Sequence, residues 1–330
     1  MIKISIGIPT YNQEKYIEKT LQSLLAQNYP NFEIVVSNNY STDKTLEILD
    51  RYKSSIRIIS PEKHLPMGRH AYFTTSQLSG DWLILMSSDD IAKPTMLSDL
   101  AKEVENYPDA ILVRGAFETI DANGNITDIN HILSAKKIIR PPKTIEEQMY
   151  GSIGSLNASM FKRTAWKLIE NKFPTPNLAY DWAIFIMLSP LGDFIYTDKI
   201  VGQYRANYRP LVSKSRVFEE LEDDILVYHD LFPLITQNRF DVNLKKLRKA
   251  IDKRMNMRIA HTLKNIETEH EFQRLLNILK SASDRLPLKT QIACVTQKKP
   301  IRNNFLEDLY TRVTRSKIIR KIYMGLMHRG

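Results

Sequence analysis

An apolar run that ends in two adjacent carboxylates constrains this chain more than any other feature. Residues 83–86 read Leu-Ile-Leu-Met, and Ser87, Ser88, Asp89 and Asp90 follow directly. Four apolar residues before a polar tip indicate a buried central strand. In open α/β sheets ligands bind at the carboxyl ends of the strands, and paired carboxylates there offer the oxygen ligands that a divalent cation prefers.

The same carboxylates also have a plain structural interpretation. Acidic turns are common after strands, and Asp90 could simply lead into a helix that has Pro94 as its first residue. Taken alone, the two residues favour this turn over a functional site.

Composition sets the bounds on what the chain can be. With 330 residues, 43% of them hydrophobic, the chain can form one large α/β domain and an accessory region. Its single cysteine, Cys294, excludes an intrachain disulfide framework and a metal site of several thiolates. The first residues lack the pattern of a signal peptide, and no apolar run reaches membrane-spanning length. We therefore expect a cytoplasmic protein.

Positive charge is concentrated in the last third of the chain. Residues 1–215 hold 24 Lys+Arg and 23 Asp+Glu, whereas residues 216–330 hold 23 and 14. This asymmetry predicts a boundary near Arg216 and an anionic partner for the second part. Nucleic acid is disfavoured as that partner, because the basic residues are not interleaved with an aromatic sheet or a helix-turn-helix signal.

The first hundred residues alternate between strand and helix patterns. Strands are predicted over 2–8, 32–36 and 56–59 before the central strand, with helices over 16–25, 46–49 and 71–78 between them. Short connections between such elements predict crossover units and a parallel sheet.

Beyond the carboxylates the pattern becomes mixed and then helical. A helix over 94–104 and a strand over 110–113 are followed by Asn123-Gly124, a hairpin signal that predicts antiparallel strands. Further elements are predicted as helices over 144–150, 163–170 and 181–187, strands near Ile195 and Val201, and almost only helices from Arg216 onward.

Several of these segments together resemble the inverting family 2 glycosyltransferases of bacterial surface-polysaccharide type, which have the GT-A fold. The matching segments are residues 5–12, 24–30, 32–36, 41–43, 80–82, 88–90 with Lys93-Pro94, and 180–182. They cover roughly residues 1 to 210, and their order and spacing are far more specific than any one motif.

The resemblance implies a fold, a domain layout and an activity. The fold is α/β, a Rossmann-like mixed sheet flanked by helices, with residues 1–105 as the nucleotide-binding half and 106–215 as the acceptor-binding half. Residues 216–330 would be a basic helical region. The implied enzyme is a hexosyl- or deoxyhexosyltransferase that moves a sugar from a nucleoside diphosphate to a saccharide, or lipid-linked saccharide, in O-antigen or capsule synthesis.

The resemblance also assigns the chemistry to two aspartates. Asp89 would hold Mg²⁺ or Mn²⁺, although Ser87 stands where the family often has a second aspartate. Asp90 would support that ion or contact the sugar, and a role as a helix-start residue is equally open. Asp181 would be the base that deprotonates the acceptor hydroxyl. The alternative for Asp181 is a carboxylate that merely stabilises a helix N-terminus.

Substrate contacts follow from the same resemblance. The nucleotide-sugar would meet Pro9, Thr10, Tyr11, Asn38, Asn39, Arg69, Ser88, Asp89 and Asp90, and the acceptor would meet Tyr180 and Trp182. His70, Arg205 and Arg209 are further candidates, each with a plain surface or structural alternative. The aromatic pair could equally belong to the core.

Asn38 and Asn39 occupy positions where the family frequently has aspartates. A carboxylate only accepts hydrogen bonds, whereas an amide also donates them. We therefore hypothesise relaxed base choice, with dTDP or CDP sugars as alternatives to UDP sugars. A catalytically inactive scaffold of the same fold would also suit these departures, but Asp89 and Asp181 are both present.

The chain end combines apolar and basic residues at helical spacing. Within residues 309–330 an apolar stripe is flanked by six Lys or Arg, with no acid after Asp308. Such a helix is predicted to lie on an anionic membrane, which here would be the cytoplasmic face of the inner membrane. The alternative is an ordinary helix packed on the catalytic domain.

Overall fold

The computed structural model describes residues 1–130, 137–150, 156–170, 176–206, 216–237, 243–266 and 268–283. The chain divides into two compact units. The first comprises Met1–Arg209 with Ile235–Val242, and the second comprises Pro210–Leu234 with Asn243–Gly330. Residues 207–215, at the end of the predicted catalytic domain, lie outside the described part of the chain.

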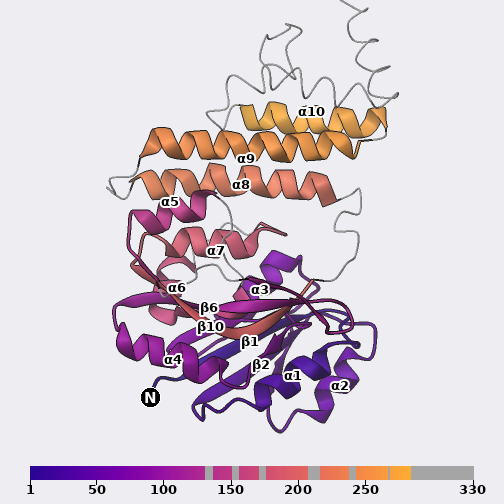
Figure 1. The fold of residues 1–330 in the computed structure, drawn as a ribbon. Coiled ribbons are helices and arrows are strands. Elements are labelled where there is room, and N and C mark those ends of the chain that lie inside the picture. The colour runs from indigo at the N-terminus through magenta and orange to yellow at the C-terminus, as the bar shows by residue number, and fades with distance from the viewer. Residues whose placement is uncertain are drawn as a thin grey trace, which may run out of the picture. The chain divides into compact units, whose positions relative to one another are not determined.

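A ten-stranded sheet organises the first unit (Figure 1). Its principal order is β3-β2-β1-β4-β9-β6-β10-β5. The first four strands in this order run parallel, as the strand-helix alternation predicts. Their bounds are Ile4–Thr10 (β1), Phe32–Asn38 (β2), Arg57–Ile59 (β3) and Trp82–Leu85 (β4). The strand before the carboxylates is therefore central and buried.

Antiparallel strands enter the second half of the sheet, as the hairpin signal predicts. Strand β9 lies antiparallel between β4 and β6, while β6 and β10 run parallel to each other. These strands span Ile91–Ala92 (β5), Ala110–Ile120 (β6), Ile126–Asn130 (β7), Lys137–Ile139 (β8), Ser159–Lys162 (β9) and Asp193–Arg205 (β10). The β6–β7 turn contains Gly124 at φ 96°, a left-handed conformation that glycine adopts without a steric penalty.

One long strand replaces the two separate strands predicted near Ile195 and Val201. In β10 the register against β6 shifts between Tyr196 and Ile200, and again before Gly202. This irregularity interrupts the alternation of side chains, which explains why the sequence pattern looks like two strands.

Helices cover both faces of the sheet. In Figure 1, α1, α2 and α4 lie on one face, and α3, α6 and α7 lie on the other. Their bounds are Ile17–Leu25 (α1), Thr45–Arg51 (α2), Met67–Ser76 (α3), Met96–Asn106 (α4), Lys143–Tyr150 (α5), Arg163–Ile169 (α6) and Tyr180–Leu188 (α7), with a 3₁₀ turn at Leu156–Ala158 (η1). The prediction of a mixed sheet flanked by helices is confirmed.

Two predicted helix starts were wrong. Helix α4 begins at Met96 and not at Pro94, because the carbonyl of Thr95 accepts the first helical bond, from the Asp99 N–H at 2.8 Å. Helix α3 begins at Met67, four residues before the predicted start. The polar and small residues of its first turn carry no apolar periodicity that would reveal it.

Three helices make up the described part of the second unit: Arg216–Gln237 (α8), Leu244–Lys264 (α9) and Glu269–Ser283 (α10). The helical prediction for residues after Arg216 holds over these ranges. Apolar positions predicted to form stripes are buried here, among them Leu221, Leu247, Leu275 and Leu279.

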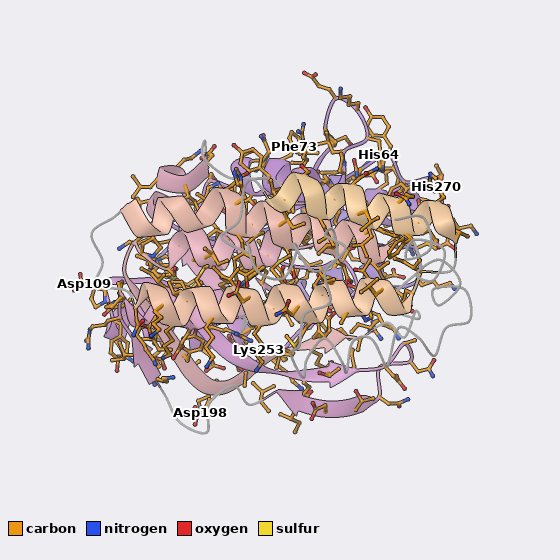
Figure 2. All side chains as sticks on the ribbon, turned by 90° about the horizontal axis from the view of Figure 1, so that it is seen from above. His64, Phe73, Asp109, Asp198, Lys253 and His270 are labelled. Atoms are coloured by element: carbon orange, nitrogen blue, oxygen red, sulfur yellow. The ribbon has the colours of Figure 1, made fainter. Side chains whose placement is uncertain are left out.

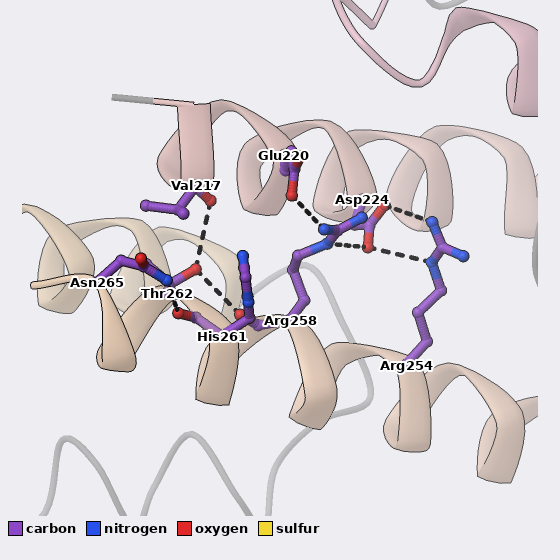
Figure 3. A network of polar contacts seen from close by, with 8 residues as sticks. All are labelled: Val217, Glu220, Asp224, Arg254, Arg258, His261, Thr262 and Asn265. Carbon is purple, nitrogen blue, oxygen red and sulfur yellow. Dashed lines mark hydrogen bonds and ion pairs between the residues drawn. The ribbon is translucent and has the colours of Figure 1, made fainter. Parts of the chain in front are cut away.

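Opposite charges separate onto α8 and α9. Helix α8 contains six Asp or Glu and one Arg, and α9 contains eight Lys or Arg and one Asp. Asp224 on α8 accepts hydrogen bonds from Arg254 and Arg258 on α9, and Arg258 also pairs with Glu220 (Figure 3). Lys253 is exposed on α9 and labelled in Figure 2.

The predicted membrane helix over residues 309–330 and Cys294 both lie outside the described residues. Within the described ranges, no helix has the combination of length and hydropathy needed to cross a membrane.

Candidate active site

A cavity of about 170 Å³ opens at the carboxyl ends of β1 and β4. It brings together residues from both predicted halves of the first unit, more than ninety positions apart in the sequence. The lining residues are Pro9, Met67, Leu85, Met86, Ser87, Leu156, Asn157, Leu178, Tyr180, Asp181 and Tyr204. This position agrees with the rule that ligands of open α/β sheets bind at strand carboxyl ends.

Asp181 reaches this cavity from the first turn of α7. Its Oδ1 accepts a hydrogen bond from the backbone N–H of Trp182 at 2.7 Å, and the side chain is partly exposed. The rest of α7 is apolar on every side and buried, which fixes its N-terminus at the cavity.

Asp89 and Asp90 differ sharply in environment. Asp89 is partly exposed, whereas Asp90 is 1% exposed. The Oδ2 of Asp90 accepts from the Asn157 amide at 2.7 Å, and its Oδ1 accepts from the Arg205 backbone N–H at 2.8 Å. Burial, reinforced by the neighbouring Asp89 charge, raises the pKa of Asp90 well above its ordinary value.

These contacts hold both oxygens of Asp90 within the protein, and its support of the ion or contact with the sugar stays a prediction. Its two oxygens are turned inward to Asn157 and to β10, so Asp90 joins the β4–β5 turn to the second half of the unit. Ser88 is also buried, and its carbonyl accepts from the Thr20 hydroxyl at 3.1 Å. Ser87 is the member of this turn that lines the cavity.

Arg205 anchors the same turn from β10. Its Nε donates to the Asp89 carbonyl at 2.9 Å and its Nη1 donates to the Asp121 carbonyl at 2.8 Å. The guanidinium also lies over the Tyr16 ring, 4.7 Å from the centroid. With 4% exposure Arg205 supports the Asp89 main chain and is not placed to bind a ligand. Arg209 lies outside the described residues.

Asn39 is locked in place by the backbone of another loop. Its Nδ2 donates to the Leu65 carbonyl at 2.8 Å, and its Oδ1 accepts from the Leu65 N–H at 2.9 Å. The amide therefore holds the segment before α3. Because both of its polar atoms are used by Leu65, the Asn39 side chain is not placed to select a nucleobase. Asn38 is also buried, and its Oδ1 accepts from the Ser41 N–H at 3.2 Å.

The loop after β1 contains one exposed aromatic side chain. Tyr11 is 45% exposed, and its ring meets His64 edge-on at 5.1 Å between centroids. His64 is labelled in Figure 2. Thr10 is 1% exposed, and its carbonyl accepts from the Asn39 N–H at 2.9 Å. Its buried hydroxyl has no hydrogen-bond partner among the described residues, and its contact with the nucleotide stays a prediction. Pro9 lines the cavity.

The Ser-Thr-Asp motif after β2 is a structural link to this loop. The Asn12 side chain accepts from the Thr42 N–H at 2.8 Å, and the Asn12 N–H donates to the Ser41 hydroxyl at 3.0 Å. The Asp43 carboxylate accepts from the Thr45 and Glu14 N–H groups at 2.9 and 3.1 Å. Both loops are thereby fixed relative to each other.

Arg69 and His70 face opposite ways on α3. Arg69 is exposed, while His70 is 3% exposed with its Nε2 2.8 Å from the Ser37 hydroxyl. The expectation that His70 could be a solvated residue was wrong. Burial, with a smaller effect of the His64 charge, lowers the pKa of His70 to about 4.

Trp182 belongs to the core. It is 1% exposed, and its indole N–H donates to the Gln148 carbonyl at 2.7 Å. The ring therefore offers no face to an acceptor, which corrects that prediction. Tyr180 does line the cavity, together with Asn157 and Tyr204, which the sequence interpretation did not identify. The Tyr-Arg pair at positions 204–205 is the sequence signal that points to this tyrosine.

Few side chains at this site could act as ligands for a metal ion. Within the described residues, no cluster of three or more His, Cys, Asp or Glu side chains is arranged to hold a metal ion. Asp89 is a partly exposed carboxylate, and Ser87 adds a hydroxyl beside it. Mg²⁺ commonly uses only one or two carboxylates when substrate phosphates complete its coordination, so the residues fit an ion that arrives with a diphosphate.

Residues 5–166 match the family model described as "Glycosyl transferase family 2". These residues form a family 2 glycosyltransferase domain. The match covers the parallel half of the sheet, the β4–β5 turn and β9, but it ends before Asp181.

Two curated relatives of this domain are bacterial proteins. Poly(ribitol-phosphate) beta-N-acetylglucosaminyltransferase TarS of Staphylococcus aureus is 32% identical over 34% of this chain and 21% of TarS. Chondroitin synthase of Escherichia coli is 26% identical over 60% of this chain and 28% of that protein. The chain thus spans well under half the length of these two relatives.

Solved structures establish the fold. Crystal structures of S. aureus TarS residues 1–349 superpose with a TM-score of 0.67 at 19% identity, over 98% of this chain and 91% of the other. The mannosyltransferase PcManGT of Pyrobaculum calidifontis, solved with GDP-Man and Mn²⁺, has a TM-score of 0.53 at 13% identity over 95% of this chain and 87% of the other. The predicted GT-A fold is confirmed.

Proposed function

We propose that this protein is a glycosyltransferase that moves a sugar from a nucleoside diphosphate to a saccharide acceptor with inversion. The observation that carries the proposal is the cavity that joins the β1 and β4 strand ends to the Asp181 carboxylate. A donor bound at the strand ends and an acceptor beside Asp181 would meet within one enclosed site. The family match over residues 5–166 supports the donor half.

Asp181 is the proposed base. Inversion requires a group that removes the proton from the acceptor hydroxyl as this hydroxyl attacks the anomeric carbon. Asp181 stands in the first turn of α7 and lines the cavity, where its carboxylate would accept that proton. The opposite carboxylate, Asp90, cannot share this role because its two oxygens are occupied within the protein.

Asp89 is the proposed protein ligand for Mg²⁺ or Mn²⁺. When bound, the ion would neutralise negative charge that develops on the departing diphosphate. The Arg205 guanidinium fixes the main chain of Asp89, two positions after Ser87, which lines the cavity. Asp89→Ala should abolish the metal-dependent part of the rate, and a wild-type rate indifferent to a chelator would contradict this assignment.

The donor and acceptor classes are proposed from the relatives. TarS structures contain UDP and UDP-GlcNAc, which supports a uridine nucleotide as the first donor to test. Chondroitin synthase is named for a polysaccharide product, which supports a saccharide acceptor, lipid-linked in O-antigen or capsule assembly. In this proposal residues 1–215 are catalytic, and the basic region 216–330 seats the enzyme on the cytoplasmic face of an anionic membrane.

Deleting residues 309–330 tests the membrane contact. The truncated protein should lose salt-sensitive cosedimentation with anionic liposomes and retain activity on a soluble acceptor. Retained liposome binding would contradict the role proposed for this segment.

Substituting the base tests the activity itself. Asp181→Asn should lower turnover by about 10²- to 10⁴-fold, the contribution of a positioned base, while nucleotide binding stays near the wild-type value. Asp99→Asn is the matched control, since Asp99 is likewise a first-turn carboxylate, on α4. Unchanged turnover in Asp181→Asn would refute the assignment.

A catalytically inactive scaffold remains the second candidate. It is favoured by the single carboxylate left at the β4 end, where Ser87 replaces the family's usual aspartate. Incubation with a panel of free nucleotide sugars separates the two, because an active enzyme hydrolyses its donor slowly without acceptor. Absence of both hydrolysis and transfer across the panel would support the scaffold.

A further inference from the structure

A row of polar side chains on α1 lies against the segment that contains Asp89. Thr20, Ser23 and Gln27 follow Tyr16 at intervals of four, three and four residues, so they share one side of the helix and of its C-terminal end. The adjacent side of α1 is apolar and packs into the core. Helix α1 also packs against β5, the short strand that follows the acidic turn. The polar row therefore runs along the border between the core and this turn.

Thr20 contacts the main chain on both sides of Asp89. Its side chain is fully buried, and its hydroxyl lies 3.1 Å from the Ser88 carbonyl and 2.8 Å from the Asp90 carbonyl. Because a hydroxyl has a single proton to donate, the two carbonyls share it. One side chain of α1 thus holds both neighbours of Asp89 in the sequence.

Ser23 and Gln27 hold the chain that follows. The Ser23 hydroxyl accepts from the Ala92 N–H at 3.1 Å. The Gln27 amide donates to the Lys93 carbonyl at 2.8 Å and accepts from the Leu97 N–H at 3.0 Å. The segment is therefore bound to α1 from the turn after β4 to the first turn of α4.

The carbonyl of Asp89 itself is held from another element. The Arg205 Nε donates to it, and the same guanidinium lies over the ring of Tyr16, the residue before α1. Side chains thus bind the carbonyls of three consecutive residues, 88–90. A ligand of a metal ion is oriented by the groups that hydrogen-bond around it, and loss of such a group typically lowers ion affinity by about 10- to 100-fold.

We propose that the polar row of α1, formed by Thr20, Ser23 and Gln27, positions Asp89 for the cation that arrives with the donor diphosphate. Thr20 has the largest effect, because its hydroxyl binds the residues on both sides of Asp89. Ser23 and Gln27 act from farther along the chain and have smaller effects. The inference rests on the proposed function in one respect, namely that Asp89 is a ligand of this ion.

Binding of Mn²⁺ tests the role of Thr20 without reference to turnover. Electron paramagnetic resonance measures free Mn²⁺ in the presence of the full chain and one nucleoside diphosphate, the one of UDP, dTDP, CDP and GDP that the wild type binds most tightly. Thr20→Val keeps the side-chain shape and removes the hydroxyl, so Mn²⁺ binding should weaken by about 10-fold. Nucleotide binding with a chelator present should stay at the wild-type value. Wild-type Mn²⁺ affinity in Thr20→Val would overturn the proposal.

Thr20→Ser is the conservative variant. It keeps the hydroxyl and removes the methyl group, so it should restore Mn²⁺ affinity to near the wild-type value even where it lowers the melting temperature. A side chain that only stabilises the fold would show the reverse relation, with Mn²⁺ affinity following the melting temperature in both variants. That result would also overturn the proposal.

Thr144→Val is the matched control for loss of a buried hydroxyl. Thr144 is 1% exposed, and its hydroxyl donates to the Ser189 carbonyl at the end of α7, at 2.6 Å. The control should lower the melting temperature without weakening Mn²⁺ binding, and equal weakening in Thr144→Val and Thr20→Val would refute a specific role for α1. Ser23→Ala is the milder variant if Thr20→Val does not fold. It should weaken Mn²⁺ binding by a smaller factor, and wild-type affinity in it would then refute the proposal.

Asp89→Ala separates this inference from the proposed function. If Asp89→Ala loses Mn²⁺ binding and Thr20→Val does not, the inference alone is refuted. If both variants weaken Mn²⁺ binding but the wild type transfers no sugar, the proposed transfer alone is refuted. Wild-type Mn²⁺ affinity in Asp89→Ala would refute the ligand assignment and the inference built on it. In an active enzyme, Thr20→Val should raise the Mn²⁺ concentration for half-maximal rate and leave the acceptor KM unchanged.

Discussion

Two aspartates with the same 1% exposure occupy opposite kinds of environment in the two units. Asp224 in the helical unit is met by two guanidinium groups, from Arg254 and Arg258, at 3.0 to 3.1 Å. Asp90 in the sheet unit receives only neutral donors, the Asn157 amide and the Arg205 backbone N–H. Opposite charge offsets desolvation in the first case, and protonation becomes favourable in the second.

Buried charged residues have different roles in the two units. In the helical unit the acids of α8 and the arginines of α9 join two helices, so buried charge has a structural role. In the sheet unit the Arg205 guanidinium donates to backbone carbonyls, so from Arg205 the Asp90 carboxylate receives only the backbone N–H.

The largest effect is expected where a buried charge loses its partners. Arg254→Leu with Arg258→Leu should lower the free energy of unfolding of the helical unit by about 3 to 5 kcal/mol, because Asp224 stays buried without a cation. Urea denaturation followed by far-UV circular dichroism measures it. The control is Arg51→Leu, whose pair with Glu18 is exposed and contributes about 0 to 1 kcal/mol.

A triple variant that also replaces Asp224 tests whether the buried charge causes the loss of stability. Adding Asp224→Leu to the double variant should recover much of the lost stability, because no charge then remains buried. If the double variant is as stable as the Arg51→Leu control, Asp224 is not held by its arginines and the contrast with Asp90 disappears.

His70 extends the comparison to a buried base with a neutral partner. Its pKa is lowered to about 4 by burial, with His64 as the charged neighbour and the Ser37 hydroxyl as its contact. Below pH 6.5 the unfolded chain takes up a proton that the folded chain does not. The folded state therefore loses stability as pH falls from 6.5 towards 4, by up to about 3 kcal/mol.

A titration of stability against pH measures this loss. His70→Gln retains a hydrogen-bonding group but cannot titrate, so its unfolding free energy should fall less over this window than that of the wild type. His270→Gln, at an exposed histidine on α10, should follow the wild-type curve. Parallel curves for wild type and His70→Gln would show that His70 ionises freely in the folded protein.

Periodicity and turn chemistry were enough to predict most of the sheet unit's elements. The isoleucines of β1 at positions 4, 6 and 8 are fully buried, and the Asn123-Gly124 hairpin forms as its turn chemistry requires. These signals are local, so a single sequence contains them. The start of α3 was missed because Met67, Gly68 and Arg69 lack an apolar stripe.

Side-chain roles that depend on distant contacts could not be predicted in the same way. Asn39 clamps Leu65, 26 residues away, and Trp182 donates to Gln148, 34 residues away. Asp90 meets Arg205 across 115 residues. Motif spacing placed all of these near the site, but only the folded chain decides which polar groups are used by the protein and which are left for a ligand. Tyr204 was missed for this reason.

The smallest effect, and the one that tests the comparison most directly, concerns Asp90→Asn. The folded-state pKa of Asp90 is raised, so at pH values above the unfolded pKa the folded chain retains a proton that the unfolded chain has released. Its contribution to stability is therefore complete below the unfolded pKa and is lost as pH rises through the folded pKa. The Asp89 charge adds to this loss, and the neutral donors from Asn157 and Arg205 only partly offset it.

The Asp90→Asn substitution removes the ionisable carboxyl group and keeps nearly the same side-chain shape. The Asn157 amide can turn to offer its oxygen to the new NH₂ group, so the net change at the pH of greatest stability should be only about 1 kcal/mol. The stability of wild type relative to Asp90→Asn should fall steadily as pH is raised from 4. A difference that is independent of pH, or one that grows in the other direction, would show that Asp90 is ionised and compensated in the fold. Asp90 would then resemble Asp224, and the two units would treat buried charge alike.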